Sequence, residues 1–312
     1  MNNPGPFNGK QKTENGKLSF KCGYVALMGL PNVGKSTLLN RLVGEKLAIT
    51  SPKPQTTRFR LLGILNRPGA QLLFLDTPGV IDPKGALNEA LVQAAITALN
   101  EADVVVWLVA PEPPDTRGRV LLPHLKKLER AMLIAVNKID LVAKPKLLPV
   151  MAAYHELFPQ APVVPVSALL GDGLSDLLNE IVQLLPEAPP FYPEDLPTDA
   201  TERFLAAEFI RERVFHHTGE EIPYAVAVQI EEFDERRRPE LVVIRALIYV
   251  ERQSQKGIVI GKHGKMLKLI GQEARVEIEN LLGARVFLEL WVKVWKNWRK
   301  DPRAVRQLGY QA

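Results

Sequence analysis

The chain has 312 residues, of which 46% are hydrophobic, and a formal net charge of +5 at pH 7. This length is enough for two domains with separate cores, and no apolar run is long enough to span a membrane. The single cysteine, Cys22, excludes an internal disulfide framework and indicates a reducing cytoplasm. Residues 1–19 are polar, with Asn, Gly and Pro, so they are expected to be a disordered tail and not a secretory signal.

The first motif in the chain is G-L-P-N-V-G-K-S, from Gly29 to Ser36, which matches the phosphate-loop pattern. It lies between a predicted buried strand, residues 24–28, and a predicted helix that begins near Thr37. Its glycines let backbone N–H groups point at phosphate oxygens, its lysine neutralises the outer phosphates and its serine hydroxyl binds Mg²⁺. The motif predicts a nucleotide site that includes Gly29, Pro31, Asn32, Val33, Gly34, Lys35, Ser36 and Thr37.

A second motif, Asp76-Thr77-Pro78-Gly79, follows the apolar run 72–75. Asp76 is therefore expected at the end of a strand, where its carboxylate can hold Mg²⁺ through water. Gly79 can present its N–H to the γ-phosphate.

Two further motifs predict that the base is guanine. Asn137-Lys138-Ile139-Asp140 follows the apolar run 132–136. The Asp140 carboxylate can accept hydrogens from guanine N1 and N2, whereas adenine has no such donor pair and should be rejected. Ser167-Ala168-Leu169 follows a predicted strand, and the Ala168 N–H can reach guanine O6.

In this order, the four motifs resemble those of translation-factor-class GTPases. G-x-P-N-V-G-K-S with D-T-P-G is similar to the branch that contains Era, Der and MnmE, and the single phosphate loop argues against Der, which has two tandem GTPase domains. Gln55-Thr56-Thr57-Arg58 resembles the Q-T-T-R of Era proteins. That likeness implies that Thr57 closes on Mg²⁺ and the γ-phosphate, with Thr56 as the alternative.

Val80 occupies the position at which Ras-like enzymes place a water-orienting glutamine. Intrinsic hydrolysis is therefore expected to be slow. Asn32 resembles the asparagine that binds K⁺ in the MnmE-like branch, and such a cation would neutralise charge between the phosphates. The alternative is that Asn32 only shapes the loop. The predicted catalytic residues are Lys35, Thr57, Gly79 and Asn32.

Strand-like and helix-like runs alternate from residue 20 to residue 186, which predicts an α/β domain with a mainly parallel sheet and helices on both faces. The next segment, 187–200, is a predicted proline-rich linker, because five prolines in residues 186–197 cannot sustain a helix or a central strand. The linker is expected to separate the two domains.

The second predicted domain, 201–312, has a helix at 202–216 and strands at 224–230 and 241–250. It continues with I-G-K-H-G at 260–264, a helix at 266–282 and a strand at 285–293. This order resembles an α+β type II KH domain. The resemblance implies that Gly261 and Gly264 let an RNA backbone approach, while Lys262, His263 and Lys265 face its phosphates.

Charge and aromatic residues agree with RNA binding. Residues 251–312 carry 13 Lys and Arg against 6 Asp and Glu, whereas residues 201–250 carry 7 against 10. Trp291, Trp295 and Trp298 alternate with basic residues. Packing is favoured for Trp291, and both packing and RNA stacking stay open for the other two. K-N-W-R at 296–299 and L-G-Y at 308–310 resemble the C-terminal motifs of Era proteins.

The resemblance to the Era family implies a GTP-hydrolysing switch that uses GTP/GDP and Mg²⁺, with K⁺ as a further candidate cofactor. It implies a monomer that binds the 3′ end of 16S ribosomal RNA and assists maturation of the small (30S) ribosomal subunit. It places the protein in the cytoplasm, and peripheral association with the inner face of the cell membrane is a further expectation. Two alternatives are a membrane-surface signalling GTPase, which would not need the GXXG loop, and a phosphate-loop metabolic kinase, which N-K-I-D opposes.

Overall fold

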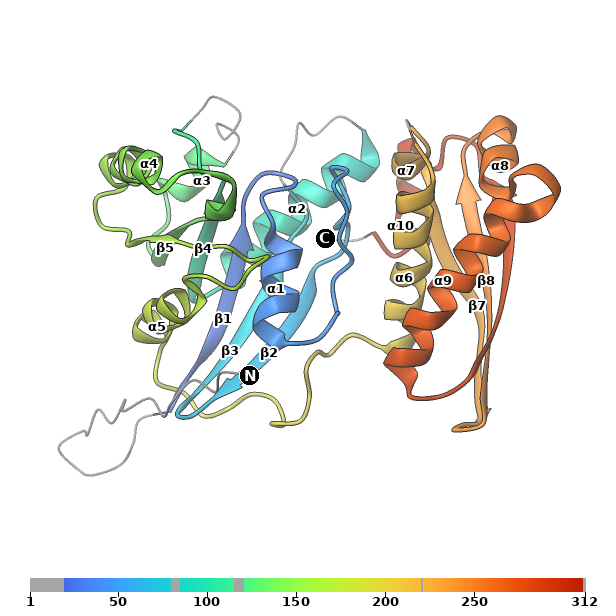
Figure 1. The fold of residues 1–312 in the computed structure, drawn as a ribbon, viewed down its shortest axis with the longest axis horizontal. Coiled ribbons are helices and arrows are strands. Elements are labelled where there is room, and N and C mark those ends of the chain that lie inside the picture. The colour runs from blue at the N-terminus through green and yellow to red at the C-terminus, as the bar shows by residue number, and fades with distance from the viewer. Residues whose placement is uncertain (1–19, 80–84, 115–120, 220, 311–312) are drawn as a thin grey trace.

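The computed structural model describes residues 20–79, 85–114, 121–219 and 221–310, which form two lobes (Figure 1). The predicted N-terminal tail, residues 1–19, and Val80 lie outside the described residues. Within the described ranges, no helix is long and apolar enough to cross a membrane.

The first lobe is built on a six-stranded sheet with the order β2-β3-β1-β4-β5-β6. All neighbouring strands are parallel except β2 and β3, which are antiparallel. The strands are β1 (Lys21–Met28), β2 (Leu61–Arg67), β3 (Ala70–Asp76), β4 (Val104–Val109), β5 (Ala131–Val136) and β6 (Val163–Pro165). The mainly parallel sheet predicted from the alternating pattern is confirmed.

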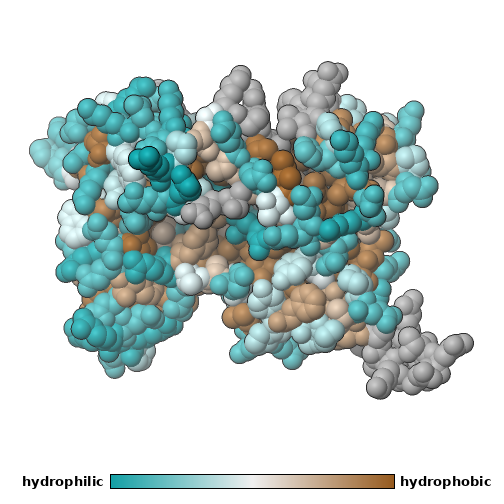
Figure 2. Space-filling view, turned by 180° about the vertical axis from the view of Figure 1, so that it is seen from behind, coloured by the Kyte–Doolittle hydropathy of each residue, from teal (hydrophilic) through white to brown (hydrophobic). Residues whose placement is uncertain are grey.

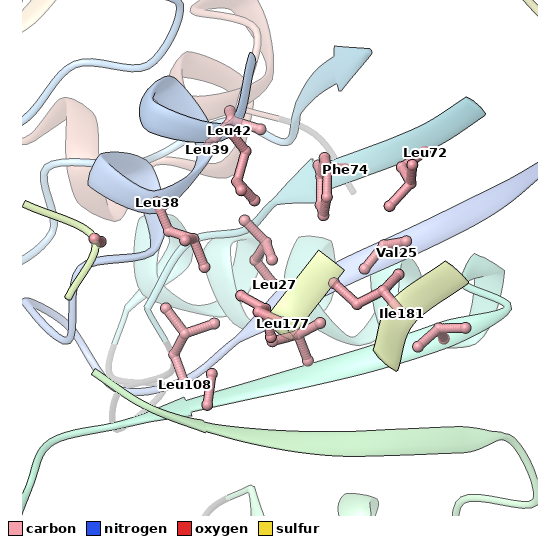
Figure 3. Close-up of a cluster of buried hydrophobic side chains, with 14 of the residues drawn as sticks. Val25, Leu27, Leu38, Leu39, Leu42, Leu72, Phe74, Leu108, Leu177 and Ile181 are labelled. Carbon is pink, nitrogen blue, oxygen red and sulfur yellow. The ribbon is translucent and has the colours of Figure 1, made fainter. Parts of the chain in front are cut away.

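Helices cover both faces of this sheet because its central strands are apolar on both sides. The helices are α1 (Lys35–Val43), α2 (Ala86–Glu101), α3 (Leu122–Leu125), α4 (Lys144–Leu157) and α5 (Leu174–Leu184). On β1, Val25 and Leu27 pack with α1 and α5, as Figure 3 shows, while Ala26 and Met28 face α2 and α4. The alternation along β1 thus fixes both helix layers and carries the loop after Met28 to the sheet's carboxyl edge.

The second lobe has a three-stranded sheet, β7-β8-β9, in which β8 is antiparallel to β7 and parallel to β9. Its elements are α6 (Glu202–His217), α7 (Ile222–Ala225), β7 (Ala227–Arg237), β8 (Leu241–Val250), α8 (Gln253–Ile260), α9 (Lys265–Leu282), β9 (Val286–Val294) and α10 (Pro302–Gln307). Apolar side chains of α6 and α9 pack against one face of the sheet and form a core of their own. The strand predicted at 224–230 begins later, at Ala227, and extends seven residues further, through Arg237.

The two lobes pack against each other. Leu87 and Leu91 of α2 share a buried cluster with Trp298, Val305 and Tyr310 of the C-terminal segment. Figure 2 shows the molecule from behind. A notch separates the two lobes at their lower edge, and above the notch their surfaces meet. Residues 187–200, predicted to be the linker, lie between α5 of the first lobe and α6 of the second, and hydrophobic burial holds the two lobes against each other.

Candidate nucleotide site and nucleic-acid interface

The loop between β1 and α1 has backbone conformations that only certain residues adopt easily. Gly34 caps α1 with φ 103°, and a Cβ there would lie 2.3 Å from the side-chain nitrogen of Asn137. A Cβ on Gly29 would lie 2.4 Å from the carbonyl oxygen of Leu108. The glycines of the motif are thus required by φ and by close packing against neighbouring strand ends. A cavity of about 550 Å³ opens over this loop, which is within the usual range for small-molecule sites.

Three side-chain oxygens converge beside this cavity. Ser36 Oγ donates to Asp76 Oδ2 at 2.6 Å and lies 2.7 Å from Thr57 Oγ1. Asp76 is fully buried, and its Oδ1 has no hydrogen-bond partner among the described residues. Burial raises the pKa of this carboxyl, opposed by Lys35 and the Ser36 hydroxyl. A buried carboxylate with a free oxygen beside two hydroxyls is the all-oxygen environment that Mg²⁺ takes. The residues present therefore fit that ion.

The two threonines of Gln55-Thr56-Thr57-Arg58 point in different directions. Thr57 faces Ser36 and Asp76, whereas Thr56 Oγ1 donates to the carbonyl of Lys53 at 2.7 Å. The geometry favours Thr57 over Thr56 as the residue near the metal position.

Lys35 lies beneath the loop and is buried. Its ammonium donates to the carbonyls of Gly29 at 3.2 Å and Leu30 at 3.0 Å. Burial lowers its pKa to about 8, and the charge of Asp76 partly opposes that shift. An ammonium group in this place can move to an anion above the loop at little cost, since neither of its present partners is charged.

The D-T-P-G motif is held close to the phosphate loop. Thr77 Oγ1 donates to the carbonyl of Leu27 at 2.8 Å, and a Cβ on Gly79 would come within 2.7 Å of the Pro31 backbone. Pro78 is buried between these two contacts. Only glycine fits at position 79, so its backbone can reach the cavity that Gly79 and Pro31 both line.

The two predicted base-recognition segments meet at one point. Asn137 donates from its side-chain nitrogen to Val33 O at 2.7 Å and accepts from the Ala168 N–H at 2.9 Å. Ser167 Oγ donates to Asp140 Oδ1 at 2.6 Å, which orients that carboxylate. Lys138 Nζ donates to the Asn32 carbonyl at 2.6 Å. Leu169, by contrast, is 68% exposed at the outside of its loop.

Sequence reasoning missed part of the cavity wall. The cavity is also lined by Thr50, Ser51 and Pro52, and by His216 from α6 of the second lobe. Asn32 donates from its side-chain nitrogen to the Pro52 carbonyl at 2.6 Å, which closes the segment 50–52 over the loop. No local pattern marks these residues, because Pro52 is held by a contact with Asn32 from a distant part of the chain and His216 reaches the cavity through the packing of the two lobes.

The I-G-K-H-G loop joins α8 to α9. Gly261 and Gly264 have φ 72° and 74°, and Lys262, His263 and Lys265 are exposed. A Cβ on Gly261 would collide with Met266 at 2.6 Å, whereas a Cβ on Gly264 would meet nothing within 4 Å. Gly264 thus faces open space, where another backbone can approach.

A groove of about 390 Å³ continues from this loop between α9 and β9. Leu267, Leu288 and Leu290 supply apolar surface, and Lys268 and Arg275 supply positive charge. The groove residues on α9 and its N-cap have the spacing of one helix face: Gly264, Lys268, Gly271 and Arg275. From this spacing, the sequence alone could have predicted that the interface continues along the helix beyond the loop.

The three tryptophans of the C-terminal segment differ in environment. Trp298 is completely buried, stacks on Tyr310 and donates from Nε1 to the Ala225 carbonyl at 2.9 Å. Trp295 packs edge-to-face on Tyr249. Trp291 on β9 is 40% exposed. The expectation that this side chain packs on the domain is therefore wrong. Of the two alternatives for Trp298, packing on the domain and stacking on RNA, the structure supports packing.

Comparisons with known proteins agree with this geometry. Residues 24–138 match the family model described as "50S ribosome-binding GTPase", and residues 221–299 match the KH domain model. GTPase Era of Geotalea uraniireducens is 50% identical over 293 residues, which cover 94% of this chain and 98% of that protein. GTPase Era of Lactobacillus helveticus is 46% identical over 291 residues, covering 93% and 96%.

Two solved structures superpose on most of the chain. One is Era in complex with MgGDPNP and nucleotides 1506–1542 of 16S ribosomal RNA, and the other is a variant of Aquifex aeolicus Era bound to GDP and aluminium fluoride. Each has a TM-score of 0.91, 44% sequence identity, and coverage of 94% of this chain and 100% of that chain.

Proposed function

The chain belongs to the Era family of GTPases, and from this we propose that it is a nucleotide-dependent switch that binds the 3′ end of 16S ribosomal RNA during maturation of the small (30S) ribosomal subunit. One observation carries the proposal. The same chain has an oxygen-lined phosphate-loop cavity and a groove with Lys268 and Arg275 beside an exposed GXXG loop, and a relative that superposes on 94% of the chain was solved with this RNA. We place the protein in the cytoplasm as a monomer.

In the nucleotide site, we propose that Gly29 to Thr37 surround the phosphates and that Asn137, Lys138, Asp140 and Ala168 bind the base. Ser36, Thr57 and Asp76 would hold Mg²⁺, which supplies positive charge between the phosphates when bound. Lys35 and the Gly79 N–H would stabilise the charge that develops on the γ-phosphate as water attacks it. The support is that Lys35, Ser36, Thr57, Gly79 and Lys138 line one cavity. Ser36 donates a hydrogen bond to Asp76, and the Asn137 side chain joins the phosphate loop to the Ala168 peptide.

Asn32 is the proposed K⁺ ligand. Its side-chain nitrogen is used by the Pro52 carbonyl, so its oxygen is the atom that can bind a cation.

In the second domain, we propose that Gly261 and Gly264 accept the RNA backbone, that Lys262, His263 and Lys265 contact phosphates, and that unstacked bases enter the groove between α9 and β9. Lys268 and Arg275 extend the phosphate contacts along α9.

The test measures RNA affinity by fluorescence anisotropy with a non-hydrolysable GTP analogue present. One labelled oligonucleotide carries the 3′-terminal sequence of 16S ribosomal RNA, and its control carries the same bases in scrambled order. We expect the first to bind at least about tenfold more tightly, because base contacts add to the phosphate contacts that both share. Equal affinities for the two oligonucleotides would contradict the proposed target.

A further inference from the structure

The segment 46–58, here called switch I, is hydrogen-bonded along its length to the second domain. The Lys46 ammonium forms an ion pair with the Glu212 carboxylate. Both backbone polar groups of Thr50 are bonded to α6: its N–H donates to Glu212 Oε1 at 2.9 Å, and its carbonyl accepts from His216 Nε2 at 3.0 Å. Because a carbonyl can only accept, the imidazole carries its proton on Nε2 in this contact.

The middle of switch I caps the end of α6. The ammonium of Lys53 donates to the carbonyls of Phe215 and Thr218, in the last turn of that helix. Those carbonyls have no partner within the helix, and the helix dipole places negative charge there. The cation therefore satisfies both the hydrogen bonding and the charge of the helix end.

The far end of switch I is buried in the second domain. Arg211 of α6 donates to the Thr56 carbonyl at 2.5 Å. Arg58 is completely buried and donates to the carbonyls of Pro223, Tyr224 and Val226 at 2.6–3.0 Å. Thr57 thus lies between two anchored neighbours, with its hydroxyl 2.7 Å from Ser36 Oγ.

The C-terminal end of α6 also forms part of the nucleotide cavity itself, since His216 lines it together with Thr50 and Ser51. A loop that closes over a ligand loses conformational entropy when it orders. Hydrogen bonds from a rigid helix reduce that loss at the time of binding, because the loop is already held near its closed arrangement.

We propose that the end of α6 is a wall of the nucleotide site, in which His216 and Glu212 are positioning residues. They hold switch I closed so that Thr57 faces the metal, and the RNA-binding domain thereby favours retention of GTP over GDP. The inference rests on the proposed role of Thr57 as a ligand that the triphosphate state uses. By linkage, GTP must favour docking of the second domain to the same extent.

The experiment measures dissociation of a fluorescent GTP analogue and of fluorescent GDP, each with Mg²⁺, from the full-length protein. His216→Ala removes the Thr50 contact, and Lys53→Met removes the cap on α6 while keeping a chain of similar length. His216→Gln is the conservative variant, since its amide can still donate to the Thr50 carbonyl. His217→Ala is the matched control, because His217 is the next residue of α6 but bonds Glu273 of α9 and not switch I.

We expect the GTP analogue to leave His216→Ala about two- to tenfold faster than the parent, the range for one lost hydrogen bond, and to leave Lys53→Met at least as fast, because that variant loses two. GDP should leave less than about twofold faster, and His217→Ala should match the parent. His216→Gln should recover most of the retention.

Equal acceleration of both nucleotides, or no acceleration in either variant, would overturn the proposal while leaving the guanine-nucleotide site of the parent intact. If the parent itself bound no guanine nucleotide, the proposed function would fail along with this inference.

Discussion

At the scale of single residues, the candidate site depends on polar groups whose partners come from distant parts of the chain. Ser167 orients Asp140, and Asn137 ties the phosphate loop to the Ala168 peptide. Each of these contacts joins two strand-end loops, so the base pocket and the phosphate loop are held as one unit. Hydrogen bonds between such groups give selectivity because an unmatched buried partner is costly.

Asp140→Asn should lower GTP affinity by at least about a hundredfold and raise affinity for xanthosine triphosphate, because the new amide donates where the carboxylate accepted. Nucleotide titrations measure both affinities. Asp172→Asn is the control, since it makes the same chemical change at an exposed position in the neighbouring loop. GTP binding as tight in Asp140→Asn as in the parent would remove the guanine assignment.

Lys35 links nucleotide binding to pH. Burial gives its ammonium a pKa of about 8, and a phosphate beside it would raise that pKa again. Above pH 8, GTP binding then takes up a proton, so affinity should fall by up to about tenfold per pH unit. Calorimetric titrations in buffers of different ionisation enthalpy measure the proton uptake. Lys35→Ala should bind GTP far more weakly and show no uptake, and uptake that persists in this variant would assign the proton to another group.

At the scale of elements, two segments make contacts between the domains: switch I and the C-terminal segment that contains α10. Switch I lies against α6, and the C-terminal segment places Trp298 and Tyr310 against Phe59 and α2. Because α2 follows the D-T-P-G loop in sequence, the C-terminal segment touches the elements next to both nucleotide-sensing loops.

The phosphate loop predicts a cation effect. GTP hydrolysis should be faster in K⁺ than in Na⁺ at equal ionic strength, because K⁺ at the Asn32 oxygen would neutralise charge between the phosphates. Asn32→Ala should remove the difference, which initial rates of phosphate release measure. Equal rates of the parent in both salts would reject K⁺ and leave the Asn32 side chain with a structural role, the hydrogen bond to the Pro52 carbonyl.

Trp298→Ala should destabilise the protein by about 3–5 kcal/mol, since it opens a cavity and leaves the Ala225 carbonyl without its donor. Trp291→Ala is the matched control, and we expect a loss below about 1 kcal/mol at this partly exposed position. Urea unfolding measures both. A similar loss in the free energy of unfolding for the two variants would mean that the buried contact of Trp298 does not stabilise the protein.

At the scale of the whole molecule, the proposed RNA surface and the nucleotide cavity lie in different lobes, and α6 of the second lobe contacts both. That helix packs on α9, which lines the proposed RNA groove, and its end lines the nucleotide cavity. Nucleotide binding at the cavity can therefore affect RNA binding at the groove, and the reverse, through displacement of α6 as a rigid element.

Gly264→Asp should nearly abolish binding to the 16S ribosomal RNA 3′ end, because it adds bulk and negative charge where the RNA backbone approaches. Gly264→Asn is the control for the positive φ of this residue, since it adds similar bulk without charge and Asn tolerates that conformation. Lys300→Ala and Arg303→Ala should weaken binding modestly and lower the salt slope by roughly one each. RNA affinity across a salt series measures all four variants. Strong binding by Gly264→Asp with failure of the tail variants would indicate a general basic surface.

Local sequence was sufficient for much of this protein. The phosphate loop, D-T-P-G, N-K-I-D and the GXXG loop are contiguous motifs whose chemistry depends on neighbouring residues, and the alternation of apolar runs predicted the parallel sheet. Strand ends were predicted less well, as at β7, because strand pairing across the sheet sets where a strand begins and ends.

Tertiary structure alone decided how the domains meet. The prolines of 187–200 predicted an extended linker at the domain boundary but gave no information on contacts between the domains, where Arg58, Trp298 and Tyr310 are buried. The burial of Trp298 against α2 and the place of His216 in the nucleotide cavity depend on residues more than 100 positions apart in the chain, and the orientation of Thr57 depends on the folding of switch I. Such contacts leave no periodic pattern in the sequence, because they arise from the packing of surfaces that are formed only after each domain has folded.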